Sequence, residues 1–284
     1  MLTLFCRFPM VLAGTYLTAV VGYYVFPFSW SWNLALTFGS ILSATDPVAV
    51  SALLEEVGAP PRLKIHIGGE SLLNDGSAMV FYTIFSSLFL TELGIKGVGE
   101  SIDVAGGFAL FFRMSLGGAA VGIAFAMGLI FILYVLNRRL TTAENVVQVC
   151  STVTVAYLCY YTSDSVCGAS GVIAVLTCGV LTQAFGSAMI NDAHMMNAFW
   201  ELVEQLLNTL LFTLGGLEFG GVISNYGERV DFWTAFEWGY LILLWVLLHA
   251  IRFACVYSFY PITSRLGLST NWKECFFLSY GGLR

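Results

Sequence analysis

The sequence is poor in charged residues. Lys, Arg, Asp and Glu make up 11% of its 284 residues, against roughly 25% in soluble proteins. A soluble fold of this size needs more polar side chains to cover its surface, so the shortage argues against a soluble protein. The charges sum to −6, and without a basic excess nucleic acid is not expected as a partner.

Other patterns are missing as well. The seven cysteines are scattered and form no Cys-x-x-Cys pair, which argues against a disulfide scaffold or a zinc site. No Pro-rich, Gly/Ser-rich or highly charged linker separates soluble domains. Nothing in the residue pattern indicates a nucleotide site, a metal cofactor or a nucleophilic triad, so we expect neither a cofactor nor enzyme activity.

The sequence contains several long apolar segments. Hydrophobic residues make up 58% of it, and its mean hydropathy is +0.81. A membrane-spanning helix needs about 20 mostly apolar residues, and a series of such segments predicts an all-α, multi-pass integral membrane protein in a lipid bilayer. The segments are 10–27, 32–54, 71–90, 105–136, 146–161, 171–185, 198–222, 234–260 and a shorter one from 272 to the end.

Loop charges and glycines refine this prediction. Most loop Lys and Arg fall on the side of the N-terminus, which the positive-inside rule places in the cytoplasm. Loops 60–67 and 137–143 are then cytoplasmic, and 91–104 is outside. Gly118-x-x-x-Gly122 and Gly216-x-x-x-Gly220 permit close helix packing.

Ionisable residues inside the apolar segments are functional candidates, because a charge near the bilayer centre costs several kcal/mol. Exposure at a helix end is the alternative, and it is weakest for Asp46 in mid-segment. The candidates are Asp46, Glu70, Asp75, Glu201, Glu204, Glu218, His249 and Arg252.

Thr45-Asp46-Pro47 predicts a break in the second segment. Pro47 has no N–H and clashes with the preceding turn, and it also disfavours helical geometry at Asp46. Carbonyl groups freed at membrane depth need new partners, and lining an ion site is one solution. Carbonyl and carboxylate oxygens suit a hard cation. A simple proline kink is the alternative.

The third segment opens with a polar face. Ser71 and Asp75 are four residues apart, as are Glu70 and Asn74, so all four lie on neighbouring positions of one helix. Two carboxylates, a hydroxyl and an amide are too polar for packing alone. Asp75 is able to bind either a cation or a proton, which is what exchange chemistry requires.

Several stretches together resemble the monovalent cation/proton antiporters, specifically the sodium/proton exchanger family, with the plant salt-tolerance and sperm-type exchangers as the nearest subtypes. They occur in family order over nearly the whole chain. They are SATDPVAVSALLEEVGA (43–59), GESLLNDGSAMVFY (69–82), SGVIAVLTCGVL (170–181), FWELVEQLLNTLLFTLGGL (199–217), HAIRFACVYSFYP (249–261) and SYGGLR (279–284).

The resemblance implies an inverted-repeat sodium/proton antiporter fold, in which two broken helices cross near the midplane. It implies a first half of an ion-binding core domain at 9–91, a long linking helix at 105–136, part of a dimerisation domain at 145–222 and the start of the second core half at 233–284. Compared with the family, the sequence looks like a fragment truncated at both ends. The full-length protein is expected to be a homodimer.

The resemblance also implies site roles. Asp75 is the ion- and proton-binding carboxylate and Asn74 its partner, an Asn-Asp pair that goes with electroneutral exchange. Ser71, Asp46 and the Thr45 carbonyl resemble the remaining Na⁺ ligands. Na⁺ is the expected cation, with K⁺ and Li⁺ as alternatives, and the plasma membrane is favoured over an organelle membrane.

Further implied residues lie outside this ligand set. Glu70 and Arg252 resemble a structural ion pair of the core. Glu201 and Arg284 are additional candidates for the site.

Rival interpretations remain at this point. Asp46 and Asp75 would suit an aspartic intramembrane protease, although its GxGD motif is missing. Gly168-Ala169-Ser170-Gly171, with His249 as partner, hints at a rhomboid-like serine protease. A non-transporting membrane sensor leaves the break and the polar face unexplained, and a cation channel would share the site without needing a titrating carboxylate.

Overall fold

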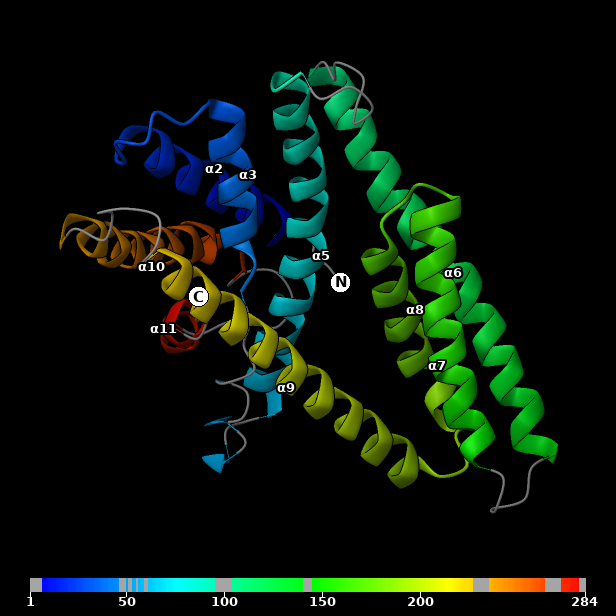
Figure 1. The fold of residues 1–284 in the computed structure, drawn as a ribbon. Helices are drawn as coiled ribbons and strands as arrows, with labels where there is room; N and C mark the ends of the chain where they lie inside the picture. The colour runs from blue at the N-terminus through cyan, green and yellow to red at the C-terminus, as the bar shows by residue number, and fades with distance from the viewer. Residues whose placement is uncertain are drawn as a thin grey trace. The chain divides into compact units, whose positions relative to one another are not determined.

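The computed structural model describes residues 7–45, 50, 53–54, 56–58, 61–94, 104–139, 145–226, 235–263 and 272–280. Throughout these ranges the regular secondary structure is helical, which confirms the all-α prediction. The elements are α2 (Arg7–Tyr24), α3 (Trp32–Ser43), α5 (Pro61–Glu92), α6 (Val104–Arg139), α7 (Val146–Tyr161), a π-helical turn (Thr162–Val166), α8 (Gly171–Gly186), a 3₁₀ turn (Ser187–Met189), α9 (Ala193–Tyr226), α10 (Ala235–Thr263) and α11 (Trp272–Tyr280) (Figure 1).

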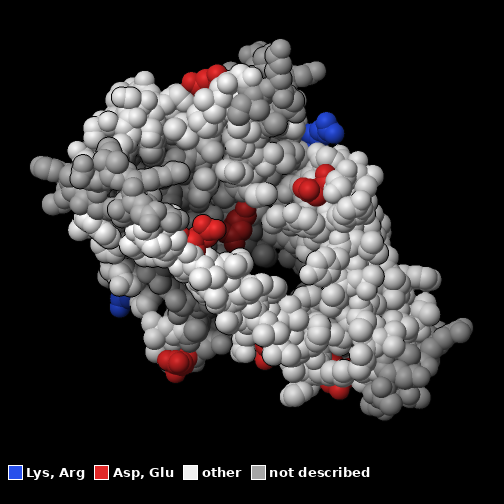
Figure 2. Space-filling view, in the orientation of Figure 1, with Lys and Arg blue, Asp and Glu red and all other residues white. Residues whose placement is uncertain are grey.

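Four helices of the described residues are long and apolar enough to cross a membrane. They are Ala109–Asn137, Gly171–Met189, Ala193–Ser224 and Trp238–Pro261. Acidic and basic side chains are sparse on the face that Figure 2 shows, as the composition leads one to expect. The chain is therefore a multi-pass integral membrane protein.

The chain divides into two compact units. The first contains Met1–Ser115 and Tyr240–Arg284, and the second contains Leu116–Gly239. Helices α6 and α10 each contribute to both units. The assignment of 9–91 and 233–284 to a core domain, of 105–136 to a linking helix and of 145–222 to a dimerisation domain stays a prediction.

In the first unit, α2 and α3 pack closely because Gly39 faces α2. A Cβ at Gly39 would lie 3.2 Å from the Ala19 nitrogen and closer still to the Thr15 carbonyl oxygen. Ser31 begins α3, and its hydroxyl accepts a hydrogen bond from the Leu34 N–H at 3.3 Å. Serine suits this N-cap position because its oxygen satisfies an amide that has no partner in the helix.

The first unit also joins α2 to the C-terminal helices. Met10 of α2 packs with Cys255 and Val256 of α10 and with Cys275 of α11. All four side chains are buried. Helices that are far apart in the sequence therefore share one interior.

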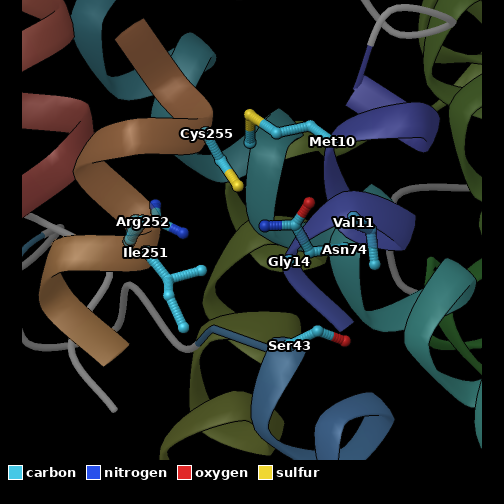
Figure 3. A pocket seen from close by; sticks show the side chains of 8 residues that line it. All are labelled: Met10, Val11, Gly14, Ser43, Asn74, Ile251, Arg252 and Cys255. Carbon is cyan, nitrogen blue, oxygen red and sulfur yellow. The ribbon is translucent and has the colours of Figure 1, made fainter. Parts of the chain in front are cut away.

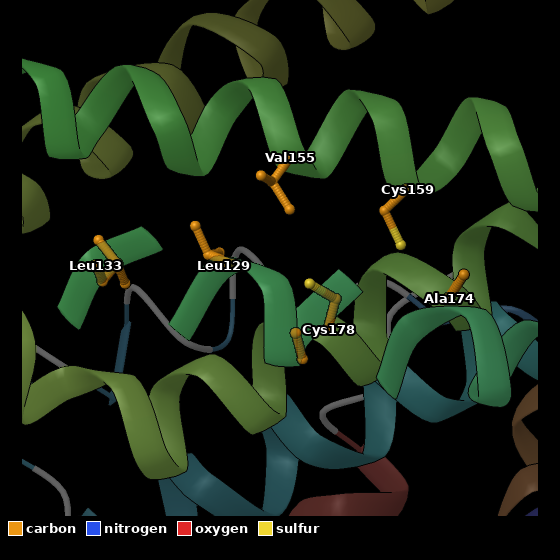
Figure 4. Packing of buried hydrophobic residues seen from close by; sticks show 7 residues of the cluster. Leu129, Leu133, Val155, Cys159, Ala174 and Cys178 are labelled. Carbon is orange, nitrogen blue, oxygen red and sulfur yellow. The ribbon is translucent and has the colours of Figure 1, made fainter. Parts of the chain in front are cut away.

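The second unit has its own interior between α6, α7 and α8 (Figure 4). The buried residues are Ala126, Leu129, Leu133, Val155, Cys159, Ala174 and Cys178. Glycines on α6 allow the close approach of α8: a Cβ at Gly118 would lie 2.7 Å from the Ser170 carbonyl oxygen, and one at Gly122 would also meet the α8 backbone.

The prediction of close packing is thus confirmed for Gly118 and Gly122. It is wrong for Gly216 and Gly220 within the described residues, because a Cβ at either position would meet nothing within 4 Å. Both of these glycines lie on α9, whose most apolar stretch has no buried residue in the described part of the chain.

The start of α5 differs from the prediction. The helix begins at Pro61, ten residues before position 71, so the predicted loop 60–67 is helical from Pro61 onward. Proline suits the first position of a helix, where its missing N–H costs nothing. Gly68 and Gly69 lie inside the helix instead of ending it, and the polar GES motif is consequently an interior part of α5.

Candidate functional site

The candidate site starts where α3 ends. The helix stops at Ser43, and Ala44 is extended with φ −63° and ψ 140°. The predicted interruption of segment 32–54 is therefore confirmed. Thr45 follows with 4% of its surface exposed, while Asp46 and Pro47 lie outside the described residues.

Two side chains of α5 hold Thr45 in place. The Ser71 hydroxyl donates a hydrogen bond to the Thr45 carbonyl oxygen at 2.8 Å. The Asn74 amide donates one to the Thr45 hydroxyl oxygen at 3.1 Å. Ser71 and Asn74 are 8% and 1% exposed, so both contacts are buried. The break after α3 is thereby fixed against the middle of α5.

This contact gathers oxygens that suit a hard cation. The carbonyl and hydroxyl oxygens of Thr45 and the hydroxyl of Ser71 belong to one buried group, into which Asn74 donates its Nδ2–H. The Thr45 carbonyl has a second lone pair beyond the one that Ser71 uses. Asn74 Oδ1 is buried without a hydrogen-bond partner among the described residues. The group thus keeps acceptors available for a ligand.

Asp75 lies on α5 one turn after Ser71, and its side chain is exposed in the structure. Successive residues turn by about 100° around a helix, so Asp75 is about 40° from Ser71 and about 100° from Asn74. The buried face of α5 is centred on Ser71 and Asn74, and Asp75 lies at its edge. A carboxylate at this edge is accessible to water while its helix neighbours are not.

Arg252 connects α10 to α11. Its Nε donates a hydrogen bond to the Ser279 carbonyl oxygen at 3.2 Å, and its side chain is 7% exposed. Ser279 in turn donates its hydroxyl to the Cys275 carbonyl at 2.8 Å. The side chain of Glu70 lies outside the described residues, so its predicted ion pair with Arg252 stays a prediction.

Two further candidates have different outcomes. Glu201 lies on α9 in the second unit, and its side chain is exposed. Arg284 lies outside the described residues. The roles of both residues at the site stay predictions.

A small cavity lies beside Asn74 in the first unit. It is partly open to solvent, and Figure 3 shows the side chains around it. Its lining comes from α2, α3, α5 and α10 and consists of Met10, Val11, Gly14, Ser43, Asn74, Ile251, Arg252 and Cys255. Sequence reasoning missed Ser43 and Gly14, although Ser43 stands only two residues before Thr45.

The structure accounts for Ser170 without protease chemistry. Its hydroxyl caps α8 by accepting a hydrogen bond from the Ile173 N–H at 3.3 Å, and its carbonyl accepts one from the Ser163 hydroxyl at 3.1 Å. Ser170 is 3% exposed. His249 makes a local contact, with its Nδ1 2.8 Å from the Trp245 carbonyl oxygen of the same helix. The rhomboid-like interpretation is not supported.

The described residues include no group of three or more His, Cys, Asp or Glu that would hold a metal ion. The oxygens at Thr45, Ser71 and Asn74 are backbone, hydroxyl and amide groups instead. Oxygen ligands of this kind suit hard cations better than soft transition metals.

Comparison with known proteins identifies similar sequences. Residues 4–284 match the family described as sodium/hydrogen exchanger, transmembrane. The chain is 34% identical over 280 residues to sodium/hydrogen exchanger 7 of Arabidopsis thaliana, covering 97% of this chain and 23% of the relative. It is 33% identical over 214 residues to the Na(+)/H(+) antiporter NhaP of Pseudomonas aeruginosa, covering 73% and 47%.

A third relative is sodium/hydrogen exchanger 3 of Oryctolagus cuniculus, at 32% identity over 260 residues, covering 88% of this chain and 28% of the relative. The chain thus spans about a quarter to a half of the length of these relatives. The resemblance noted in the sequence motifs is confirmed.

Proposed function

The chain belongs to the sodium/hydrogen exchanger family, and on this premise we propose that the protein exchanges Na⁺ for H⁺ across a membrane by alternating access. The observation that carries the proposal is the buried contact of Ser71 and Asn74 with Thr45. These hard oxygen ligands are joined to α5 within one helical turn of the Asp75 carboxylate, which follows Asn74 directly in the chain.

Coupling follows from competition at Asp75. A cation and a proton use the same carboxylate oxygens, so only one of them binds at a time. Protons in excess on one side displace the cation, and sodium in excess displaces the proton. Exchange then requires only that the site face one side of the membrane and then the other while it is occupied.

The proposed ligands around the cation are Asp75, Thr45, Ser71 and Asp46, with Asn74 as the neutral partner of Asp75. Because Asn74 carries no charge, one carboxylate trades one Na⁺ for one H⁺ and moves no net charge. We therefore propose electroneutral exchange. Glu70 and Arg252 are proposed to stabilise the core as an ion pair.

The finer aspects of function are part of the same proposal. Na⁺ is the preferred cation, with K⁺ and Li⁺ as alternatives. The protein acts as a homodimer in the plasma membrane, and it uses no cofactor beyond the ions that it moves.

The test is transport by the purified full-length protein in liposomes that contain a pH-sensitive dye. Addition of Na⁺ outside acidic liposomes should make their interior more alkaline, whereas choline should not. Clamping the membrane potential with K⁺ and valinomycin should leave the rate unchanged. Absence of sodium-dependent proton flux would contradict exchange, and a rate that follows the clamped potential would contradict electroneutrality.

A further inference from the structure

Sulfur side chains from three helices lie together in the interior of the first unit. They are Met10 of α2, Cys255 of α10 and Cys275 of α11. Their exposed fractions are 8%, 7% and 2%. The fourth buried member of the same cluster is Val256. Sulfur therefore predominates among the buried side chains at this point of the molecule.

Two of these side chains also line the cavity beside Asn74. Met10 and Cys255 extend from α2 and α10 toward the same space (Figure 3). The cavity is partly open to solvent, so a small ion can enter it and reach both sulfur atoms. Cys275 belongs to the same cluster and is almost fully buried. The sulfur cluster thus has a path that connects it to solvent.

Sulfur ligands select a soft metal ion. Thiolate and thioether groups suit Cu⁺, whereas carboxylate, carbonyl and water oxygens suit hard cations. A structural Zn²⁺ site is built from about four Cys, His or carboxylate ligands, and among the described residues no group of even three of these could hold a metal ion. Cu⁺ accepts a thioether together with thiolates. We propose that Met10, Cys255 and Cys275 form a binding site for Cu⁺.

Simple packing is the alternative explanation, because Met and Cys are common in hydrophobic interiors. Packing requires only apolar side chains of suitable volume, so a Leu in place of Met10 would serve it almost equally well. Coordination of Cu⁺ requires the sulfur atom itself. The two explanations therefore differ in what they predict when sulfur is removed and the volume of the side chain is kept.

Binding of Cu⁺ releases protons and leaves the oxidation state of copper unchanged. Cys255 and Cys275 are thiols, and each gives its proton to solvent as its sulfur bonds to the metal. A thiol that donates its hydrogen to another group keeps its sulfur lone pairs, so coordination does not require a thiol without other contacts. One Cu⁺ with two thiolates carries a single negative charge. The Arg252 guanidinium in the cavity lining therefore does not repel the occupied site.

The copper site is independent of the proposed exchange function. The oxygens at Thr45 and Ser71 are hard ligands, whereas the sulfur atoms of the cluster are soft, so Na⁺ does not compete with Cu⁺ for the cluster. Exchange needs no copper, and copper binding is measured without any transport. Failure of one proposal is therefore distinguishable from failure of the other.

Competition with the coloured Cu⁺ chelator bicinchoninate, under anaerobic conditions, measures binding to the full-length protein in detergent. In the parent protein the exposed Cys150 and Cys167 are replaced by serine, so that they do not bind copper. Met10→Leu removes the thioether and nearly keeps the volume. The control Met196→Leu makes the same change at a methionine of the second unit that is 6% exposed.

We expect Met10→Leu to weaken Cu⁺ binding by about tenfold or more, because even an outer hydrogen-bond partner of a metal ligand typically contributes about 10–100-fold to affinity. Met196→Leu should bind Cu⁺ as the parent does. Copper bound elsewhere in the protein is common to the parent and both variants, so it cancels in this comparison. Equal affinities in Met10→Leu and the parent would overturn the proposal.

The thiolates are tested against packing within the same cluster. Cys255→Ala removes a sulfur atom, whereas Val256→Ala removes two methyl groups from the next position and no sulfur. We expect Cys255→Ala and Cys275→Ala to lose the bound Cu⁺ and Val256→Ala to keep it. X-ray absorption at the copper edge, on the parent protein loaded with one Cu⁺, should show sulfur neighbours. Loss of copper in Val256→Ala to the same extent as in Cys255→Ala, or a shell of nitrogen and oxygen neighbours, would overturn the proposal.

Discussion

Substitution of Gly39 by alanine tests whether the site depends on the close approach of α2 and α3. The added Cβ would lie 3.2 Å from the Ala19 nitrogen and nearer still to the Thr15 carbonyl oxygen, both of them backbone atoms. Ordinary contact begins at 3.4 Å. No side-chain rotation relieves this clash, so one helix has to move away from the other.

The expected cost follows from two opposed effects. Overpacking of this kind costs about 1–3 kcal/mol, and replacing a helical glycine by alanine returns about 0.5–1 kcal/mol. The net loss is about 0–2.5 kcal/mol, with a central value of about 1 kcal/mol, which lowers the melting temperature by about 2–4 °C in a protein of this size. Movement of α3 also displaces Thr45, so the hydrogen bonds that it accepts from Ser71 and Asn74 are weakened.

The assay is thermal unfolding of the purified protein in detergent, followed by sodium-dependent proton flux in liposomes. Gly128→Ala is the matched control because its methyl meets no atom within 4 Å, and it should melt slightly above the unaltered protein. We expect Gly39→Ala to melt below both and to show a raised KM for Na⁺. A melting temperature equal to that of the control would refute the packing argument.

Three further changes test other parts of the account. Ser71→Ala should destabilise the protein by about 1–3 kcal/mol, because it leaves the buried Thr45 carbonyl short of a donor, and a melting curve that matches the unaltered protein would contradict this. Gln148→Leu should cost a similar amount, since its amide makes two hydrogen bonds to the backbone after α8; urea unfolding measures it. Glu70→Ala and Arg252→Ala should each lower the free energy of unfolding by about 3–5 kcal/mol. The double change should lower it by less than the sum of the two single changes. Additive losses would show that the two residues do not interact.

The break after α3 and the polar face of α5 were predictable because each depends on local chemistry. Pro47 constrains the residue before it whatever the surrounding fold, and the spacing of Ser71 and Asn74 follows from helical geometry. The start of α5 was not predictable in the same way. The predicted segment began at position 71, but the helix begins at Pro61 and passes through Gly68 and Gly69.

The contacts that build the site were harder to predict from the sequence. Thr45 and Asn74 are separated by 29 positions, and only the packing of α3 on α5 shows that the amide meets the hydroxyl. The cavity requires four helices, two of them from opposite ends of the chain. No local pattern marks Gly14 or Ser43 as its lining, because their contribution depends on the tertiary arrangement alone.

The most direct test of the central claim is the uptake of radioactive sodium into liposomes in exchange for protons that leave down an outward gradient. The protein tested is the full-length protein with Asp75→Asn. The change keeps the size of the side chain and one carbonyl oxygen, but it removes the charge and the titration. A matched control is Asp164→Asn, which alters another exposed carboxylate in the π-helical turn of the second unit. With equal amounts of inserted protein, we predict that Asp75→Asn abolishes exchange and that Asp164→Asn preserves it. Uptake at the unaltered rate by Asp75→Asn would contradict the account, and the coupling carboxylate would then have to be Asp46 or Glu201.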